Sequence, residues 1–348
     1  MTERRKKLLK WVGYPLLAWT TFLFAAHFTF PYERLRDRLV EALGKEFDVS
    51  IASIRPGLLP GRVTIEVLSL TTRPKRDDEK PKTLIIERVD LALGVLALVG
   101  RTVSVDVDAK LGGGRLVGDV SYSSSAVTVD LRTEDVSLES VPGLDAITGG
   151  APIVGPFVAK LKLNLPNGKW ATGNGGLEVS CSGCTIGDGV TKVRPMSPGQ
   201  QNAFTSEGMT LPRIRLGEFS GKIPISKGVA CIERFEARGG DIELTLEGGV
   251  KFADPFKDTQ GTLQARLKSS EEFKRASVRN AALFTGVRDA EGFTTYVARN
   301  APLVALRWLE ARSPFTPLPE CRGLKAMISP CDQSQANSAP RYCGGNFS

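Results

Sequence analysis

The segment Ala237–Phe252, ARGGDIELTLEGGVKF, contains two glycine pairs and a regular alternation of apolar and polar side chains. Its apolar residues all have even numbers and continue through the second glycine pair: they are Ile242, Leu244, Leu246, Val250 and Phe252. A period of two is typical of a strand with one apolar face. A two-residue hairpin at Gly248 and Gly249 would place Leu246 opposite Lys251 and mix the two faces. A three-residue turn keeps the faces apart, but we favour one long strand that is bent or bulged at the glycines.

The same alternation recurs through residues 48–268. In residues 49–70, VSIASIRPGLLPGRVTIEVLSL, it places Val63, Ile65 and Val67 on one face. Further candidate strands are Leu84–Leu93, Thr102–Leu111, Arg115–Tyr122, Ala126–Arg132, Phe157–Leu165, Leu177–Cys184, Arg213–Gly217, Gly228–Ala237 and Gly261–Lys268. Glycines and prolines separate them without a fixed repeat length. We therefore predict a mainly β protein built from a long, bent antiparallel meander, whose apolar face requires the sheet to close, to pair with another sheet or to curl into a trough.

A basic cluster and an uncharged apolar run begin the chain. Residues 11–30, WVGYPLLAWTTFLFAAHFTF, would cross roughly 30 Å as a helix, which is the thickness of bilayer hydrocarbon. The predicted anchor side chains are Trp11, Tyr14, Leu16, Leu17, Trp19, Phe22, Leu23, Phe24, Phe28 and Phe30. The preceding basic residues, which the positive-inside rule places in the cytoplasm, are Arg4, Arg5, Lys6, Lys7 and Lys10. We predict an uncleaved single-pass anchor with the body on the far side of the membrane; a cleaved signal peptide is the competing interpretation, because Ala25 and Ala26 are small.

Changes in pattern divide the chain into successive parts. We predict a cytoplasmic basic tail over residues 1–10, a transmembrane anchor over 11–30, a juxtamembrane amphipathic helix over 31–47, an antiparallel β domain over 48–268, a helix-containing part over 269–312 and a Pro-rich, cysteine-containing tail over 313–348. Apolar residues at steps of four, from Leu35 to Phe47, favour the amphipathic helix. Ser269–Glu272 forms an S-x-x-E capping box and predicts a helix near Glu271–Phe284. A second helix or a strand could cover Pro302–Glu310.

Composition and motifs argue against several classes of function. Half of the net charge of +8 comes from residues 1–10, and no basic helix or stacking platform follows, so we predict no nucleic-acid partner. The single histidine, His27, lies inside the predicted anchor, where we expect it to reach headgroups or water. The body therefore lacks a histidine for a catalytic triad or a metal site. The sequence contains no phosphate loop, G-x-S-x-G, S-x-x-K or EF-hand motif, and we predict no enzymatic activity, no cofactor and no metal.

The cysteines are Cys181, Cys184, Cys231, Cys321, Cys331 and Cys343. In an oxidising compartment an even set favours structural disulfides, although the spacing leaves their pairing open. The C-x-x-C at Cys181 could instead be a redox motif or half of a zinc site, but a strand-to-helix context and a second ligand pair are both missing; free thiols remain a further alternative. Alternation places Cys181 on the face of Leu177 and Val179, and Cys231 on the face of Val229 and Phe235.

Four stretches resemble a known family in their order. They are FPYERLRDRL at residues 30–39, VSIASIRPGLLPGRVTIEVLSL at 49–70, SCSGCTIGDG at 180–189 and GGDIELTLEGGVKFADPF at 239–256. Together they resemble the longer form of the type II secretion system protein N family, which is similar in style to AsmA-like proteins. The resemblance covers roughly residues 4–318 and rests on the order of the parts, since each motif alone is degenerate. The tail after Glu320 departs from the family pattern.

The resemblance implies a non-enzymatic component of the machinery that exports folded proteins. Such a protein would be anchored in the bacterial inner membrane, with its main body in the periplasm, and would act as a scaffold or assembly factor for other secretion-system subunits. The alternative is an AsmA-like lipid-binding or lipid-transfer protein with an apolar trough. In that case phospholipid acyl chains would contact Ile242, Leu244, Leu246, Val250 and Phe252.

Overall fold

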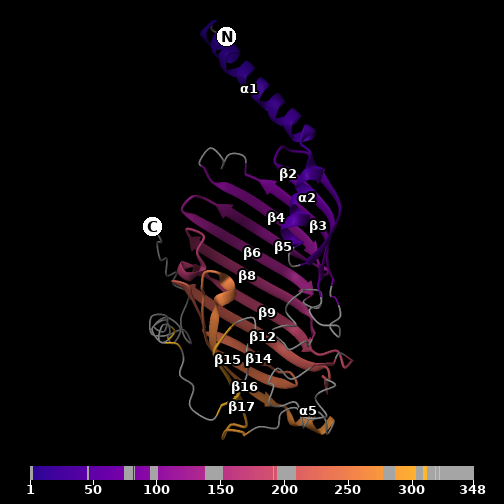
Figure 1. Ribbon diagram of the computed structural model, residues 1–348, viewed down its shortest axis with the longest axis vertical. Coiled ribbons are helices and arrows are strands. Elements are labelled where there is room, and N and C mark those ends of the chain that lie inside the picture. Colours follow the sequence, from indigo (N-terminus) through magenta and orange to yellow (C-terminus); the bar gives the residue numbers. More distant parts are fainter. Residues whose placement is uncertain are drawn as a thin grey trace, which may run out of the picture.

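One large antiparallel sheet dominates the computed structural model (Figure 1). The structure describes residues 3–44, 47–73, 81, 83–94, 101–137, 152–190, 192–193, 209–276, 287–302, 309–311, 318 and 321. The strands of this 16-stranded sheet are β1 (Phe47–Pro56), β2 (Arg62–Thr72), β3 (Thr83–Leu93), β4 (Val103–Leu111), β5 (Gly114–Tyr122), β6 (Ala126–Ser137), β7 (Ile153–Val154), β8 (Pro156–Pro166), β9 (Asn174–Ile186), β12 (Ile214–Ser226), β13 (Val229–Ile232), β14 (Arg234–Arg238), β15 (Ile242–Lys251), β16 (Gln260–Ser269), β17 (Thr294–Pro302) and β18 (Leu309–Glu310). A separate pair is formed by β10 (Lys192–Val193) and β11 (Met209–Thr210).

The strands lie side by side in nearly the order of the chain. The path runs β1-β2-β3-β4-β5-β6-β8-β9-β12-β13-β15-β16-β17-β18, with β14 between β12 and β15 and with β7 beside β9. The prediction of a mainly β protein with a long antiparallel meander is therefore confirmed. Each neighbouring pair is connected locally, so the sheet extends stepwise from its N-terminal strand (Figure 1).

Register keeps one apolar face continuous across the sheet. Directly opposed residues share a face, and one row of opposed residues crosses ten strands. The row consists of Ile54, Ile65, Val89, Ala109, Leu116, Thr133, Ala159, Val179, Gly221 and Phe235. The long sheet therefore has one mainly apolar face, and this face holds most of the core.

β15 is one continuous strand. β15 passes through Gly248 and Gly249 and pairs with β16 without a register shift, from Ile242 opposite Ser269 to Lys251 opposite Gln260. The preference for one long strand is confirmed, and a hairpin at this glycine pair is excluded. The irregularity lies in the neighbouring strands instead, because the register against β15 changes by one residue between β13 and β14.

Bulges invert the alternation at points that the sequence pattern does not show. Val67 has a φ of 49° and is 47% exposed, so it lies off the face of Val63 and Ile65, and Leu68 packs in the core in its place. The shift between β13 and β14 likewise separates Phe235 from Cys231. Phe235 packs with Leu246, whereas Cys231 packs with Val229, so the predicted shared face of Cys231 and Phe235 is wrong.

Helices lie at both ends of the sheet. α1 (Glu3–Thr29) projects away from the strands, and α2 (Tyr32–Leu43) follows it and packs beside β1 (Figure 1). Near the other end, α5 (Glu271–Ala276) is capped by Ser270, whose Oγ accepts a hydrogen bond of 3.2 Å from Phe273 N. The predicted continuation of this helix to Phe284 lies outside the described residues. So do residues 303–308 and most of the predicted tail.

By length and hydropathy, no helix among the described residues is apolar enough over a sufficient length to span a membrane. The predicted anchor side chains nevertheless all lie on α1 or just after it, and nearly all are exposed. The exposed ones are Trp11, Tyr14, Leu16, Leu17, Trp19, Phe22, Phe24, Phe28 and Phe30. Leu23 is half-buried, and the basic residues Arg4 to Lys10 form the first turns of the same helix.

Candidate functional site

The apolar face of the sheet is covered at its two ends. At the N-terminal end, Leu39 and Val40 of α2 pack on a cluster around Ile51 and Ile65. At the other end, Phe273 of α5 is buried in a cluster with Ile214, Leu216, Ala237 and Ile242. Amphipathic helices bury their apolar side chains on the sheet in both places. A binding surface on this face would therefore lie on the middle strands, β4 to β6.

Apolar side chains in the middle of this face remain accessible. We define the open apolar strip by six residues: Leu93, Val103, Val105, Val120, Tyr122 and Leu131. Leu93 is 36%, Val103 38% and Tyr122 61% exposed, and the other three are half-buried. Within the part of the chain that the structure describes, none of the six belongs to a buried cluster.

Register makes these residues one surface. Val105 lies opposite Leu93 on β3 and opposite Val120 on β5, while Val103 lies opposite Tyr122. Leu131 on β6 lies opposite Gly118, which places it diagonally across from Val120 on the same face. Opposed side chains lie about 4.5–5.5 Å apart at their Cβ atoms, so they contact one another across the strands. The open apolar strip is therefore a continuous apolar surface beside the clusters that the helices cover, and it is our candidate functional site.

The residues predicted to contact lipid lie elsewhere on the same face, within packed clusters. Ile242 is 5% exposed, and Leu244 packs beside it. Leu246 and Val250 pack with Ile232 and Leu263, and Phe252 packs in a cluster with Leu163 and Leu165. In this arrangement they serve as core, because the C-terminal strands pack against one another through these side chains.

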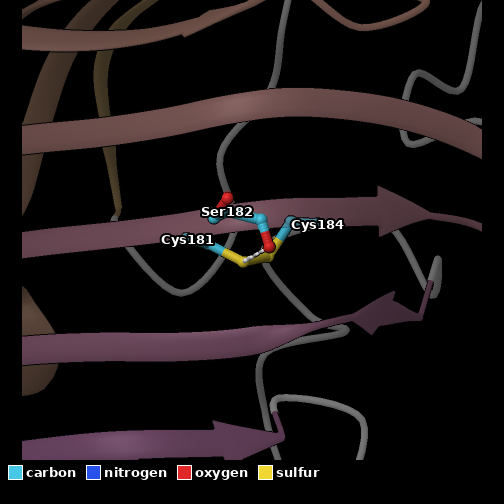
Figure 2. The surroundings of a disulfide bond; sticks show 3 residues. All are labelled: Cys181, Ser182 and Cys184. Atoms are coloured by element: carbon cyan, nitrogen blue, oxygen red, sulfur yellow. Dashed lines mark hydrogen bonds between the residues drawn. A yellow bond between two sulfur atoms is a disulfide. The ribbon is translucent and has the colours of Figure 1, made fainter.

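The disulfides among the described residues are Cys181–Cys184 and Cys231–Cys321, and they lie on opposite faces of the sheet. Cys181 and Cys184 are bonded within β9 (Figure 2), and their Cα atoms are 5.8 Å apart. They lie on the apolar face, because Cys181 opposes Phe157 and Phe219 and both cysteines pack in the same cluster. They are 4% and 1% exposed, so this C-x-x-C is a buried structural element. Gly155 lies against them, since a Cβ there would be 2.9 Å from Cys184 Sγ.

The second disulfide joins Cys231 to Cys321, with a Cα separation of 5.4 Å. It brings Cys321 and Leu318 onto the face opposite the open apolar strip, where they pack with Val229. A Cβ on Gly249 would lie 2.6 Å from Cys321 Sγ, so the second glycine of the opening strand makes room for this contact. The expectation of disulfides is confirmed for these four cysteines; Cys331 and Cys343 lie outside the described residues.

The face opposite the apolar one carries exposed ion pairs. Lys162 Nζ lies 2.9 Å from Asp130 Oδ2, and Arg115 donates to both carboxylate oxygens of Asp108. The hydrogen bonds from Arg115 hold the pKa of Asp108 below its ordinary value. A shallow depression of about 280 Å³ lies between β8, β9 and β12, where its polar lining residues are Lys160, Glu178, Ser180, Ser220 and Lys222. Alternating charges of this kind are typical of a solvated sheet face.

A buried carboxylate braces the turn between β14 and β15. Asp241 is 8% exposed and accepts hydrogen bonds from Arg215 N and Nη2 at 2.8 Å each. Burial by itself raises the pKa of Asp241, but the hydrogen bonds and charge of Arg215 outweigh burial and leave the pKa below its ordinary value. Among the described residues, no group of three or more His, Cys, Asp or Glu side chains is placed to hold a metal ion. The role of Asp241 is therefore structural, because its carboxylate is bonded to Arg215.

A junction between α1 and the sheet was missed by sequence reasoning. His27 is only 7% exposed, and its Nε2 donates a hydrogen bond of 3.0 Å to Gly57 O. Its Nδ1 then accepts from Tyr32 Oη at 2.7 Å. His27 thus faces protein groups instead of water, contrary to expectation. A backbone carbonyl thirty positions away leaves no signal in a sequence pattern.

Comparison with known proteins adds no relative: no family model, no curated protein and no solved structure matches this chain. The candidate site therefore depends on geometry alone. The resemblance to the type II secretion system protein N family stays a prediction.

Proposed function

We propose that the chain is a non-enzymatic component of the type II protein secretion machinery, anchored in the bacterial inner membrane, with its sheet as a periplasmic scaffold. The supporting observation is the strand order. Because each major strand pairs with a near neighbour in the chain, the sheet extends as one frame from the end that carries α1 (Figure 1). Such a frame offers edges, two unlike faces and loops for contact with other subunits. The sequence resemblance supplies the identity of the machine.

The anchoring part of the proposal is assigned to α1. Residues 11–30 carry no formal charge, and the apolar side chains of α1 are exposed around the helix, with Trp11 at 81% and Leu17 at 64%. A helix that is apolar all round is favoured in lipid. The basic residues Arg4 to Lys10 favour a cytoplasmic N-terminus, and the sheet would then lie in the periplasm.

Contact with other subunits is assigned to the edges of the sheet. Within the described residues, β1 has a partner strand on one side only, which is β2. An edge strand offers backbone N–H and C=O groups to an incoming strand, and strand addition of this kind gives a specific protein contact. α2 packs on β1, and the turn that follows β1 is bonded to α1 through His27 and Gly57. The edge of β1 is therefore close to the proposed anchor, where other membrane-bound subunits would meet the chain.

Photocrosslinking in cells tests the scaffold proposal. Asp48→benzoylphenylalanine places the crosslinker on exposed β1, and we expect adducts with inner-membrane subunits of the secretion machinery. Asp106→benzoylphenylalanine is the matched control, because Asp106 is an exposed aspartate on β4, which has neighbours on both sides. The proposal fails if neither position yields such adducts and deletion of the gene leaves secretion of folded proteins unchanged.

The open apolar strip favours a second candidate function, the binding of phospholipid acyl chains. Apolar surface that remains accessible contributes about 25 cal/mol per Å² when a ligand buries it. In this second candidate function, lipid contacts the open apolar strip on β3 to β6 and not the packed residues around Ile242. A protein of this kind would bind lipid or carry it along the sheet. An experiment can separate this function from that of a scaffold.

Val105 and Val117 provide a matched pair for that experiment. Both are half-buried valines, and they lie on opposite faces of the sheet, because Val105 opposes Val120 while Val117 opposes Asp108. We expect Val105→benzoylphenylalanine to form phospholipid adducts in cells and Val117→benzoylphenylalanine to form few. Equal lipid labelling at both positions, or labelling at neither, would rule out the strip as a lipid site.

A further inference from the structure

The turn between β1 and β2 exposes two leucines. Residues 57–61, GLLPG, form this turn, in which Leu58 is 85% and Leu59 48% exposed. Hydrogen bonds from Gly57 N to Arg62 O at 2.8 Å and from Arg62 N to Leu59 O at 3.1 Å hold its shape. Leu58 is the most exposed of the large apolar side chains described. A short turn in water needs no apolar residue at its tip, so a pair of them indicates a contact surface.

The position of the turn indicates which surface it meets. His27 lies in the last turn of α1 and donates to the carbonyl of Gly57 at 3.0 Å. Since a helix rises about 1.5 Å per residue, His27 lies roughly 4.5 Å before the end of the uncharged run at Phe30. Gly57 is therefore held at the depth of the last turn of the proposed anchor, and Leu58 follows it directly.

Apolar side chains at the end of α1 lie near this turn. Phe28 in the last turn of α1 and Phe30 directly after the helix are 56% and 51% exposed, and both follow His27 within three residues. Burial of His27 between α1 and the sheet fixes the turn relative to the helix. Burial also raises the pKa of Tyr32. The hydroxyl therefore keeps the proton that it donates to His27. The exposed leucines and phenylalanines thus lie at the same end of the molecule, on the two segments that the His27 bond to Gly57 joins.

We propose that the turn is a second membrane contact, in which Leu58 and Leu59 enter the acyl region of the leaflet that α1 leaves. This inference rests on the proposed anchoring of α1 and adds an orientation to it. One helix alone leaves the sheet free to rotate about the helix axis. A second contact beside it fixes the angle between sheet and bilayer and holds the edge of β1 at a defined height above the membrane.

Lipid photocrosslinking with the full-length chain tests the contact. The oxidised protein is reconstituted into nanodiscs of phosphatidylethanolamine and phosphatidylglycerol, with benzoylphenylalanine at one position in each sample. Leu58→benzoylphenylalanine is the test variant, and Phe24→benzoylphenylalanine reports on the anchor. Leu309→benzoylphenylalanine is the matched control, because Leu309 is a 63% exposed leucine on β18, at the far end of the sheet.

We expect phospholipid adducts at positions 24 and 58 and at least about tenfold fewer at 309, because burial of one leucine side chain corresponds to a factor of that order. Adducts at 24 alone overturn the turn contact and leave the anchor in place. Adducts at neither 24 nor 58 overturn the anchor as well. Equal labelling at 58 and 309 overturns the inference, since it would reflect general adhesion of lipid to exposed positions. Protein adducts at 58 in cells, without lipid adducts, would also overturn it and would assign the turn to a protein partner.

Discussion

Replacing Cys231 and Cys321 together by alanine is expected to lower the free energy of unfolding by about 4.6 kcal/mol, from loop-closure entropy in the unfolded chain. The two cysteines are separated by 90 positions, so their bond restricts a long loop of the unfolded chain. Both side chains are buried, at 3% and 7% exposure, and alanine places no polar group on that surface. The double replacement avoids a lone thiol that could pair elsewhere.

Urea unfolding of the full-length oxidised protein in detergent measures this loss. Cys181→Ala with Cys184→Ala is the matched control, because these cysteines are also buried but only three positions apart. The same entropy argument gives about 1.6 kcal/mol for that pair. The contrast between the two double variants isolates loop length from the loss of sulfur packing. Equal losses in both would contradict a dominant role for loop closure.

The course of the sheet was predictable because its cause is local. Alternation from Ile242 to Phe252 favours one strand through both glycines, and the register of β15 against β16 agrees with it. Direct pairing between strands close in the chain then gives a meander without long crossovers. The same local reasoning predicted that Cys181 shares a face with Leu177 and Val179. In the structure this is the apolar face, where Cys181 lies opposite Phe157 of β8 and Phe219 of β12.

The bulges were not predictable from alternation. A residue such as Val67 fits the period of two in the sequence, yet a φ of 49° turns it off the core face. The register change before Phe235 acts in the same way. An inserted residue shifts every later side chain by one position. A glycine would indicate such a bulge in the sequence, but a β-branched residue such as Val67 does not.

The candidate site escaped sequence reasoning for a different reason. The strands around Val105 and the strand around Leu246 have the same alternation, so pattern alone gives no ground to prefer one as an open surface. Which of them is covered depends on α2, on α5 and on packing among the C-terminal strands, all of which are long-range contacts. The bond from His27 to Gly57 is equally non-local.

Gly248→Ala is expected to destabilise the fold by about 3–5 kcal/mol, because strain at a positive φ and a backbone clash add together. Gly248 has a φ of 129°, and a Cβ there would lie 2.2 Å from Thr262 O on β16. Thr262 O is a backbone atom of a paired strand, so no side-chain rotation can relieve the clash. Relief therefore requires β15 and β16 to separate locally.

Gly239→Ala supplies the control from the same stretch of sequence. Gly239 has a φ of 77°, but no heavy atom lies within 4 Å of its added Cβ, so only the cost of the backbone conformation remains, about 1–2 kcal/mol. Urea midpoints at an unchanged m-value compare the two variants directly. A larger loss for Gly248→Ala means that the strand needs glycine here, both for its φ of 129° and for the close approach of β16. Equal losses would mean that backbone conformation alone explains both glycines, and the continuous pairing of β15 with β16 would then be wrong at its centre.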